Sequence, residues 1–420
     1  MAGALEGVHV LDCSQIIAGP VCSSLLADMG ADVVKVEPIE GEPWRLQSEF
    51  MPKESRPFIN QNRGKRGIAL DLKRPEAAPI REALIRWADV LVTNYRPGVP
   101  EALGVDYDSA RAIRPDIIYC ANTAFGTRGP DAHRRGYDIV AQAMSGLVTS
   151  NGVIENGIPR IVQFAPADAL TGAYMAWAVS AALYHREKTG EGQAIDTSLL
   201  LSALNLQAGF KEIVAMDEEP RELKRSNLAA ARARGDSIAE IYAERRAAMP
   251  ELLGNIYYRI YQTKDGNIAV GCLGPGPRAR FRRALGVHDR RYDPDFDPAK
   301  ESVAEVGQAL VAEVEQKMRE RTTAEWLAHF DANDVAAGPL RFVDELWDDP
   351  QVQANGYIAE YEHTLLGPMR GGAPVVSMSA TPTRVQRASP ALGEHNDEVL
   401  GQLGFPPEQI AQWREGGVIR

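Results

Sequence analysis

Residues 8–38 read VHVLDCSQIIAGPVCSSLLADMGADVVKVEP and contain a complete strand–helix–strand unit. The apolar run at 8–12 predicts a strand, the helical spacing of 21–31 predicts a helix, and 32–38 predicts a second strand. A Gly-Pro pair at 19–20 marks the turn into the helix. Because two parallel strands need a crossover such as a helix, this stretch predicts an α/β fold.

The same cycle repeats along the next ninety residues. GIALDL (67–72), DVLVTN (89–94) and DIIYCANTAF (116–125) predict further strands, with helical patterns at 75–88 and 107–115 between them. Strands that alternate with helices predict a doubly wound parallel sheet covered on both faces. The turn at 12–20 lacks the GxGxxG pattern, so a nicotinamide dinucleotide site is not expected there.

Length and composition indicate a second, smaller domain. A chain of 420 residues exceeds one ordinary core. Residues 217–255 are highly charged with few large apolar side chains, which predicts a solvated helical linker or insertion. From Ile256 strand character returns, Asp265-Gly266 predicts a hairpin turn, and helical segments to about residue 330 complete a small α+β domain, so residues 1–216 form the large domain.

Charge and cysteine content limit the class of protein. A formal net charge of −11 disfavours nucleic acid or an acidic membrane surface as partner. The sequence has no apolar run long enough to span a bilayer and no signal-peptide pattern at its start. Four scattered cysteines predict a reduced, cytoplasmic protein without a structural metal.

Three polar segments are candidates for binding an anionic ligand. Residues 62–76 carry a cluster of lysines and arginines, which fits either a solvated loop or a ligand with several phosphates. Asn94 and Arg96 follow a strand, where a ligand or a plain Asx-turn would use them. Arg134, Arg135 and Tyr137 precede a helix expected to begin near Asp138, and this pattern fits an anion site or a capped helix alone.

Asp168 is the candidate reagent. It lies in FAPADALTGAY (164–174), at the start of a long apolar helix. An aspartate there fits a helix N-cap, which stabilises a helix by about 1 kcal/mol. With no His-Ser or Cys-His arrangement nearby, any chemistry at Asp168 would be that of a carboxylate nucleophile.

Taken in order, these segments resemble the class III CoA-transferase family, which includes formyl-CoA and carnitine-CoA transferases. The resemblance covers VLDCSQIIAGPVCSSLLADMGADVVKVEP, NRGKRGIALDLK, VLVTNYRPG, GYDIVAQAMSGL, PADALTGAY and YHREKTGEGQAIDTSLL. It implies a large Rossmann-like domain and a small domain in two interlocked protomers, a homodimer, with residues 331–420 returning to the large domain. It also implies that acyl-CoA and a carboxylic acid are the substrates, without a tightly bound cofactor.

The resemblance assigns the family's functional residues to positions of this chain. The nucleophilic aspartate falls on Asp168, and the CoA contacts fall on Ile16, Ile17, Leu70, Asp71, Lys73, Asn94, Tyr95, Arg96, Arg135 and Tyr137. The implied reaction passes through an aspartyl anhydride and an aspartyl-CoA thioester, and we expect the helix dipole to keep Asp168 ionised.

Two departures from the family pattern refine the expectation. Formyl-CoA transferases carry glutamine where this chain has Ile17, so oxalate is not expected as acceptor. The related acyl-CoA racemases use a Gly-His-Asp motif, whereas this chain has Gly136-Tyr137-Asp138 and lacks the proton-shuttling imidazole. Transfer is therefore preferred over racemisation, and a non-catalytic CoA-binding protein remains the alternative if Asp168 is only a cap.

Overall fold

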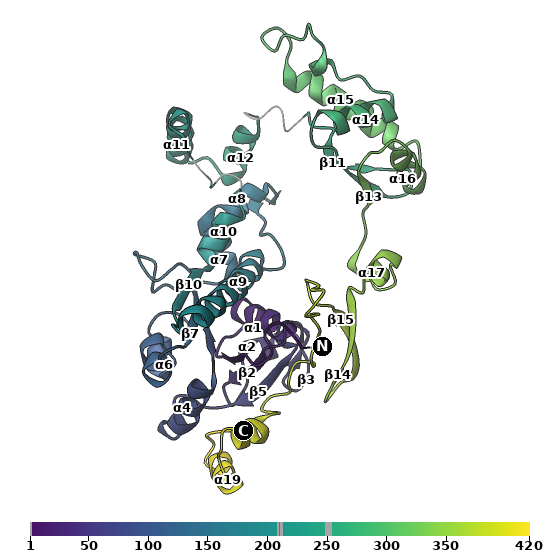
Figure 1. Ribbon diagram of the computed structural model, residues 1–420. Helices are drawn as coiled ribbons and strands as arrows, with labels where there is room; N and C mark the ends of the chain where they lie inside the picture. Colours follow the sequence, from purple (N-terminus) through teal and green to yellow (C-terminus); the bar gives the residue numbers. More distant parts are fainter. Residues whose placement is uncertain (1, 208–209, 211–212, 248–253) are drawn as a thin grey trace. The chain divides into compact units, whose positions relative to one another are not determined.

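The computed structural model describes residues 2–207, 210, 213–247 and 254–420 (Figure 1). The chain forms two compact units. The large unit comprises Met1–Glu155, Pro159–Ala215 and Gln351–Arg420, and the small unit comprises Asn156–Ile158 and Met216–Pro350.

A six-stranded sheet forms the centre of the large unit, with strand order β10-β7-β6-β1-β2-β5. Every neighbouring pair in it is parallel. Its strands are β1 (His9–Asp12), β2 (Asp32–Glu37), β5 (Lys65–Ala69), β6 (Val90–Thr93), β7 (Ile118–Thr123) and β10 (Ala194–Ser198). The parallel α/β sheet predicted from the sequence is thus confirmed.

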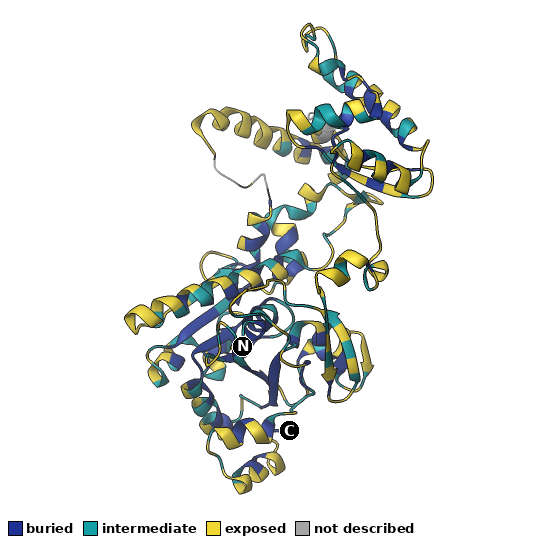
Figure 2. Cartoon of the chain, turned by 45° about the vertical axis from the view of Figure 1, so that its right-hand side comes forward, coloured by how far each residue is buried: buried dark blue, intermediate teal, exposed yellow. Residues whose placement is uncertain are grey.

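Helices cover both faces of this sheet because apolar side chains alternate along each strand. On one face, Val10, Val92 and Cys120 pack with α1 (Ala18–Asp28) and α9 (Pro166–Thr189). On the other, Leu11, Leu91 and Tyr119 pack in a cluster with helices that include α4 (Ala78–Trp87) and α6 (Tyr107–Ile113). Figure 2 shows the strands of the large unit buried between these layers.

The order of the strands determines where a ligand can bind. From β1 the chain continues to β2 and β5 on one side, and then passes to β6 on the other side of β1. The switch therefore lies between β1 and β6, and open α/β sheets bind ligands beyond the carboxyl ends of the strands at such a point.

The remaining elements of the large unit surround the sheet. The final part of the chain adds a hairpin of β14 (Ile358–His363) and β15 (Gly367–Gly372) and the helices α18 (Asn396–Gln402) and α19 (Pro407–Glu415), and Ile419 forms a bridge with Leu70 just beyond β5. The other elements that surround the sheet are α2 (Pro43–Leu46), β3 (Glu49–Met51), β4 (Glu54–Ser55), α3 (Arg56–Asn62), η1 (Pro75–Ala77), α5 (Val99–Leu103), α7 (Asp138–Ser145), α8 (Leu147–Asn151), β8 (Ile154–Glu155) and α10 (Leu199–Asn205).

The small unit has its own core. Strands β11 (Tyr258–Gln262) and β12 (Asn267–Gly271) pair antiparallel around the predicted Asp265-Gly266 turn, and β13 (Ala337–Pro339) pairs with β12. Phe281, Val314 and Phe330 of α14 (Pro275–Leu285), α15 (Val303–Met318) and α16 (Thr323–Ala332) pack in its core. The short elements η3 (Arg290–Tyr292) and η4 (Val343–Leu346) also lie in this unit.

The charged segment 217–255 is largely helical in its described residues. It contains α11 (Glu218–Arg234) and α12 (Ile238–Ala247), and residues 248–253 of the segment lie outside the described residues. Among the described helices of the whole chain, none is both long enough and apolar enough to cross a membrane.

Candidate active site

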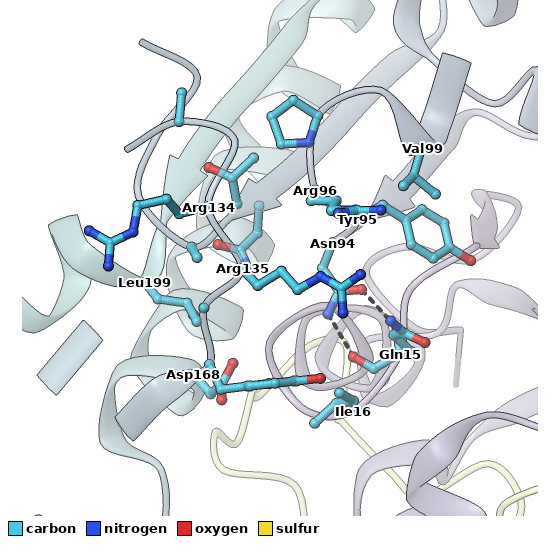
Figure 3. A pocket seen from close by; sticks show the side chains of 17 residues that line it. Gln15, Ile16, Asn94, Tyr95, Arg96, Val99, Arg134, Arg135, Asp168 and Leu199 are labelled. Carbon is cyan, nitrogen blue, oxygen red and sulfur yellow. Dashed lines mark hydrogen bonds between the residues drawn. The ribbon is translucent and has the colours of Figure 1, made fainter. Parts of the chain in front are cut away.

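A cavity of about 370 Å³ lies at the carboxyl ends of β1, β6 and β7, at the switch point of the sheet (Figure 3). Each neighbouring strand leads into residues that line it. They are Gln15, Ile16, Asn94, Tyr95, Arg96, Pro97, Val99, Asn122, Thr123, Ala124, Ala132, Arg134, Arg135, Gly136, Tyr137, Asp168 and Leu199. The fold therefore places a ligand-sized hollow where the strand order predicts one.

Asp168 lies in the first turn of α9, but it is not the N-cap of that helix. The N-cap is Ala165, and no side chain of that residue caps the helix. Instead, Oδ1 of Asp138 accepts from the N–H of Ala167 at 2.8 Å and of Asp168 at 3.2 Å. The interpretation of Asp168 as a helix cap is wrong, because the carboxylate of Asp138, thirty residues earlier, does the capping.

The Asp168 carboxylate faces the start of a second helix. It is 8% exposed, and the backbone N–H of Ala18, the first residue of α1, donates to it. Gly172 allows this approach, because a Cβ at that position would lie 2.6 Å from the Ala18 oxygen and from Cβ of Val21. The amino-terminal ends of α1 and α9 thus meet around one buried carboxyl group.

The pKa of Asp168 is raised from 3.8 to about 7, mainly by burial and additionally by the negative charge of Asp138, while the Ala18 hydrogen bond opposes the shift. The expectation that the helix dipole would keep this group ionised is therefore wrong in direction. Loss of hydration outweighs the dipole, since a buried carboxylate lacks the water that stabilises its charge.

Strained backbone borders Asp168 on both sides. Ile16 has a φ of 71°, a left-handed conformation that a β-branched residue rarely adopts, and Phe164 and Ala165 have φ values of 68° and 49°. Such conformations cost of the order of 1–3 kcal/mol each and persist where the surroundings impose them. They lie just before α1 and α9, whose first turns meet at Asp168.

Three side chains hold the loop that contains Ile16. Asn94 accepts from the N–H of Gln15 at 2.9 Å and donates to its carbonyl at 2.6 Å (Figure 3). Glu42 accepts from the N–H of Ile16 at 2.9 Å, and Lys35 donates to the carbonyl of Ser14 at 2.9 Å. Asn94 therefore positions the loop with its amide, and does not form the Asx-turn considered for it.

Two of the cations predicted in segment 62–76, Lys65 and Arg66, serve the fold. Lys65 and Arg66 lie in β5 and are buried, Lys65 pairs with Asp12 at 2.9 Å, and Arg66 pairs with Asp32 at 2.7 Å. Burial lowers the pKa of Lys65 to about 8, and the Asp12 charge opposes that shift. These side chains are neither a solvated loop nor free to bind phosphate.

The cavity brings part of the predicted site together. Asp168 lies in it with Ile16, Asn94, Tyr95, Arg96, Arg135 and Tyr137. Ile17 is the N-cap of α1 and does not line the cavity. Leu70, Asp71 and Lys73 follow β5 at the edge of the sheet, where Leu70 is buried and the N–H of Asp71 bonds to Val418.

Arg96 and Arg135 are the cations of the cavity without a partner among the described residues. Both are exposed, whereas Arg134 pairs with Asp131 at 2.8 Å. Figure 3 shows the side chain of Arg135 reaching across the cavity towards Asn94 and Gln15. Unpaired guanidinium groups are suited to phosphate oxygens.

Sequence reasoning missed several residues of the site. Gln15 and Asn122 line the cavity, and Ala18 and Asp138 contact Asp168 through the backbone. Asn122 occupies the end of β7 as Asn94 follows β6, so the rule that pointed to Asn94 could have found it. The contacts of Ala18 and Asp138 depend on tertiary packing and leave no local pattern.

A parallel sheet, a cavity at its switch point and a buried carboxyl group in that cavity are typical of an α/β enzyme. The family model of CoA-transferase family III matches residues 5–396, and the chain belongs to this family. It is a class III CoA-transferase, an enzyme of acyl-CoA metabolism, and this family uses CoA thioesters as substrates. The predicted family and enzyme class are confirmed.

Known proteins resemble the chain over nearly its whole length. A succinate–glutarate CoA-transferase of Agrobacterium fabrum is 33% identical over 416 residues, 95% of both chains. A formyl-CoA:oxalate CoA-transferase of Rhodopseudomonas palustris is 31% identical, covering 99% of this chain and 97% of that protein. A crystal structure of a CAIB/BAIF family protein from Brucella suis superposes with a TM-score of 0.72 at 28% identity, covering 96% of this chain and all of the other.

Proposed function

We propose that the enzyme transfers CoA from an acyl-CoA thioester to a free carboxylic acid through covalent intermediates on Asp168. The observation that carries the proposal is the burial of this single carboxyl group in the cavity, against the backbone N–H of Ala18. A desolvated carboxylate is a stronger nucleophile than a hydrated one, and the closed surroundings protect reactive intermediates from water.

The reaction starts with attack of an Asp168 oxygen on the thioester carbonyl, which expels the CoA thiolate and leaves a mixed anhydride. The thiolate then attacks the aspartyl carbonyl, which releases the first acid as its carboxylate and forms an aspartyl-CoA thioester. The acceptor carboxylate repeats both steps in reverse order. The Ala18 N–H donates where negative charge develops on oxygen, a contribution of about 3 kcal/mol in comparable sites.

The unpaired cations of the cavity, Arg96 and Arg135, support CoA as the bound ligand. We assign the phosphates of CoA to Arg96 and Arg135, with Ile16, Asn94, Tyr95 and Tyr137 along the same cavity. Ile17, Leu70, Asp71 and Lys73 remain proposed contacts for parts of CoA that extend beyond it. Relatives named for succinate and glutarate suggest a dicarboxylic acid as one substrate.

We further propose that the enzyme is a homodimer. The outward face of α9 exposes Trp177 at 73% and Tyr184 at 68%, seven residues apart and therefore on one side of the helix. Large exposed aromatic side chains on one face are typical of an interface.

Substitution of Asp168 tests the chemistry. Asp168→Asn and Asp168→Ala should abolish CoA transfer and still bind CoA, because the cations of the cavity are unchanged. Incubation with an acyl-CoA, hydroxylamine quenching and peptide mass mapping should place the modification on Asp168 in the wild-type enzyme. Residual transfer above one per cent in either variant, or a modified peptide without Asp168, would refute the assignment.

A further inference from the structure

One buried polar atom beside the cavity has no hydrogen-bond partner among the described residues. Asn122 is 4% exposed and lines the same cavity as Asp168, and this atom is its Oδ1. An unpaired buried amide destabilises a fold by about 1–3 kcal/mol. Because an unpaired buried amide does not stabilise the fold, its presence in the cavity requires another explanation.

Strand geometry places this amide on the face of the sheet where Asp168 lies. Side chains alternate along β7, and Ile118 and Cys120 pack with Met175 and Val179 of α9. Asn122 has the same parity, so its side chain leaves the sheet on that face. Helix α9 begins at the carboxyl edge, since its other end brings Arg186 to Asp89, which precedes β6. The first turn of α9, with Asp168, is therefore the part nearest to Asn122.

Asn94, at the end of the neighbouring strand, is an asparagine whose side chain is hydrogen-bonded within the protein, and it provides a comparison for Asn122. It follows the neighbouring strand β6, and both ends of its amide bond to the backbone of Gln15. The amide of Asn122 lacks such an anchor, so rotation about Cβ–Cγ can present either its N–H or its oxygen to the cavity without breaking a protein hydrogen bond. Of the two, Asn122 is the one available to a ligand.

We propose that the carboxamide of Asn122 recognises the bound thioester by hydrogen-bonding a polar group close to its sulfur. This inference rests on the proposed function, which brings that sulfur to Asp168. Two parts of a CoA thioester carry such a group: the secondary amide of the pantetheine arm nearest the sulfur, and a polar end of the acyl chain. Either group can hydrogen-bond the Asn122 amide. A contact with the pantetheine arm would affect the binding of every CoA derivative, whereas a contact with the acyl chain would affect only thioesters with a polar acyl end.

Binding measurements in the Asp168→Asn background test the proposal without turnover, so they remain valid even if the transfer chemistry is refuted. Isothermal titration with CoA, butyryl-CoA and succinyl-CoA compares Asn122 with Asn122→Leu, which keeps the volume and removes the amide. Loss of one neutral hydrogen bond should weaken binding about 3- to 10-fold. Weakening with all three ligands identifies the pantetheine arm, and weakening with succinyl-CoA alone identifies the acyl carboxylate.

Thermal unfolding of the ligand-free proteins separates recognition from a structural role. Asn122→Leu should melt at the same temperature or higher, because it removes an unpaired amide, and Asn122→Ser serves as a second variant if leucine does not fit. The control is Asn396→Leu, since the Asn396 amide bonds to Ala69 and Arg420 at the far edge of the sheet. This control should lower the melting temperature, and it serves as a control for stability alone, because Ala69 directly precedes the proposed CoA contacts Leu70 and Asp71.

Unchanged dissociation constants for all three ligands in both Asn122 variants would overturn the proposal. A fall in melting temperature equal to that of Asn396→Leu would also overturn it, because it would reveal a protein partner for the amide.

Discussion

At the scale of single residues, the site depends on the opposition between two aspartates. Asp138 caps α9 with its carboxylate and, through its charge, makes ionisation of Asp168 harder. A nucleophile with a raised pKa is less often ionised, yet each ionised copy is more basic and more reactive. Near neutral pH the raised pKa thus lowers the ionised fraction of Asp168 and increases the reactivity of the ionised form.

The first consequence concerns the pH dependence of the reaction. Because the pKa of Asp168 is raised to about 7, kcat/KM should fall as pH decreases through that value. Asp138→Asn should move this acid limb to lower pH, since it removes the opposing charge and keeps an oxygen for the N–H groups of α9. Steady-state kinetics between pH 5 and 9 would show the shift.

Asp116→Asn is the matched control, because Asp116 pairs with Arg114 and Arg186 away from the cavity. An acid limb near pH 4 in the wild-type enzyme, or one that Asp138→Asn leaves in place, would contradict the coupling of the two aspartates.

The second consequence concerns stability. The folded pKa of Asp168 is raised above its unfolded value of 3.8, so the penalty for ionising it in the fold appears as pH rises from about 4 to 7. Asp168→Asn should therefore be more stable than the wild type, by an amount that grows over this window and then levels off at up to about 4 kcal/mol. Urea unfolding at pH 4, 6 and 8 measures it, and equal stability at pH 8 would contradict the raised pKa.

At the scale of elements, the close contact of α1 and α9 creates the site. Gly172 brings the two helices together so that the first amide of α1 reaches Asp168. The strained loop before α1, held by Asn94, Glu42 and Lys35, fixes that amide from the other side. The position of this amide is therefore set by helix packing and backbone contacts between segments far apart in the sequence.

Gly172→Ala should separate these helices. The new methyl group would lie 2.6 Å from the Ala18 oxygen and from Val21 Cβ, so α9 must shift. We expect a loss of about 1–3 kcal/mol in unfolding free energy and a fall in kcat larger than the change in KM. Gly190→Ala at the other end of α9 is the control for kcat, since nothing lies within 4 Å of its added Cβ. An unchanged kcat in Gly172→Ala would show that the amide is not needed.

Sequence patterns predicted the elements well and the contacts between them poorly. The runs at 8–12, 32–38 and 116–125 predicted strands because alternation and apolar content are local properties. Asp168 was found by the order of motifs. Sequence patterns did not predict three contacts that join residues far apart in the chain. These are the hydrogen bond of the Asp168 N–H to Asp138, the hydrogen bond of Ala18 to the Asp168 carboxylate, and the buried pairing of Lys65 with Asp12.

At the scale of the whole molecule, the exposed aromatic face of α9 predicts self-association. Sedimentation of the wild-type enzyme should give twice the 45.9 kDa chain mass. Trp177→Glu should shift the equilibrium towards the monomer, because it places a charge on the apolar face, while Glu187→Gln near the end of the same helix should not. A wild-type enzyme that sediments as a monomer at micromolar concentration would contradict the proposed homodimer.

The edge of the central sheet has a consequence for biosynthesis. β5 is made early, yet its carboxyl end is covered by residues far later in the chain: Ile419 bridges Leu70, and Asn396 ties the N–H of Ala69 to the carbonyl of Arg420. A nascent chain on the ribosome must therefore carry an uncovered, apolar sheet margin until residues 396–420 have been made. During that interval the margin is open to chaperones.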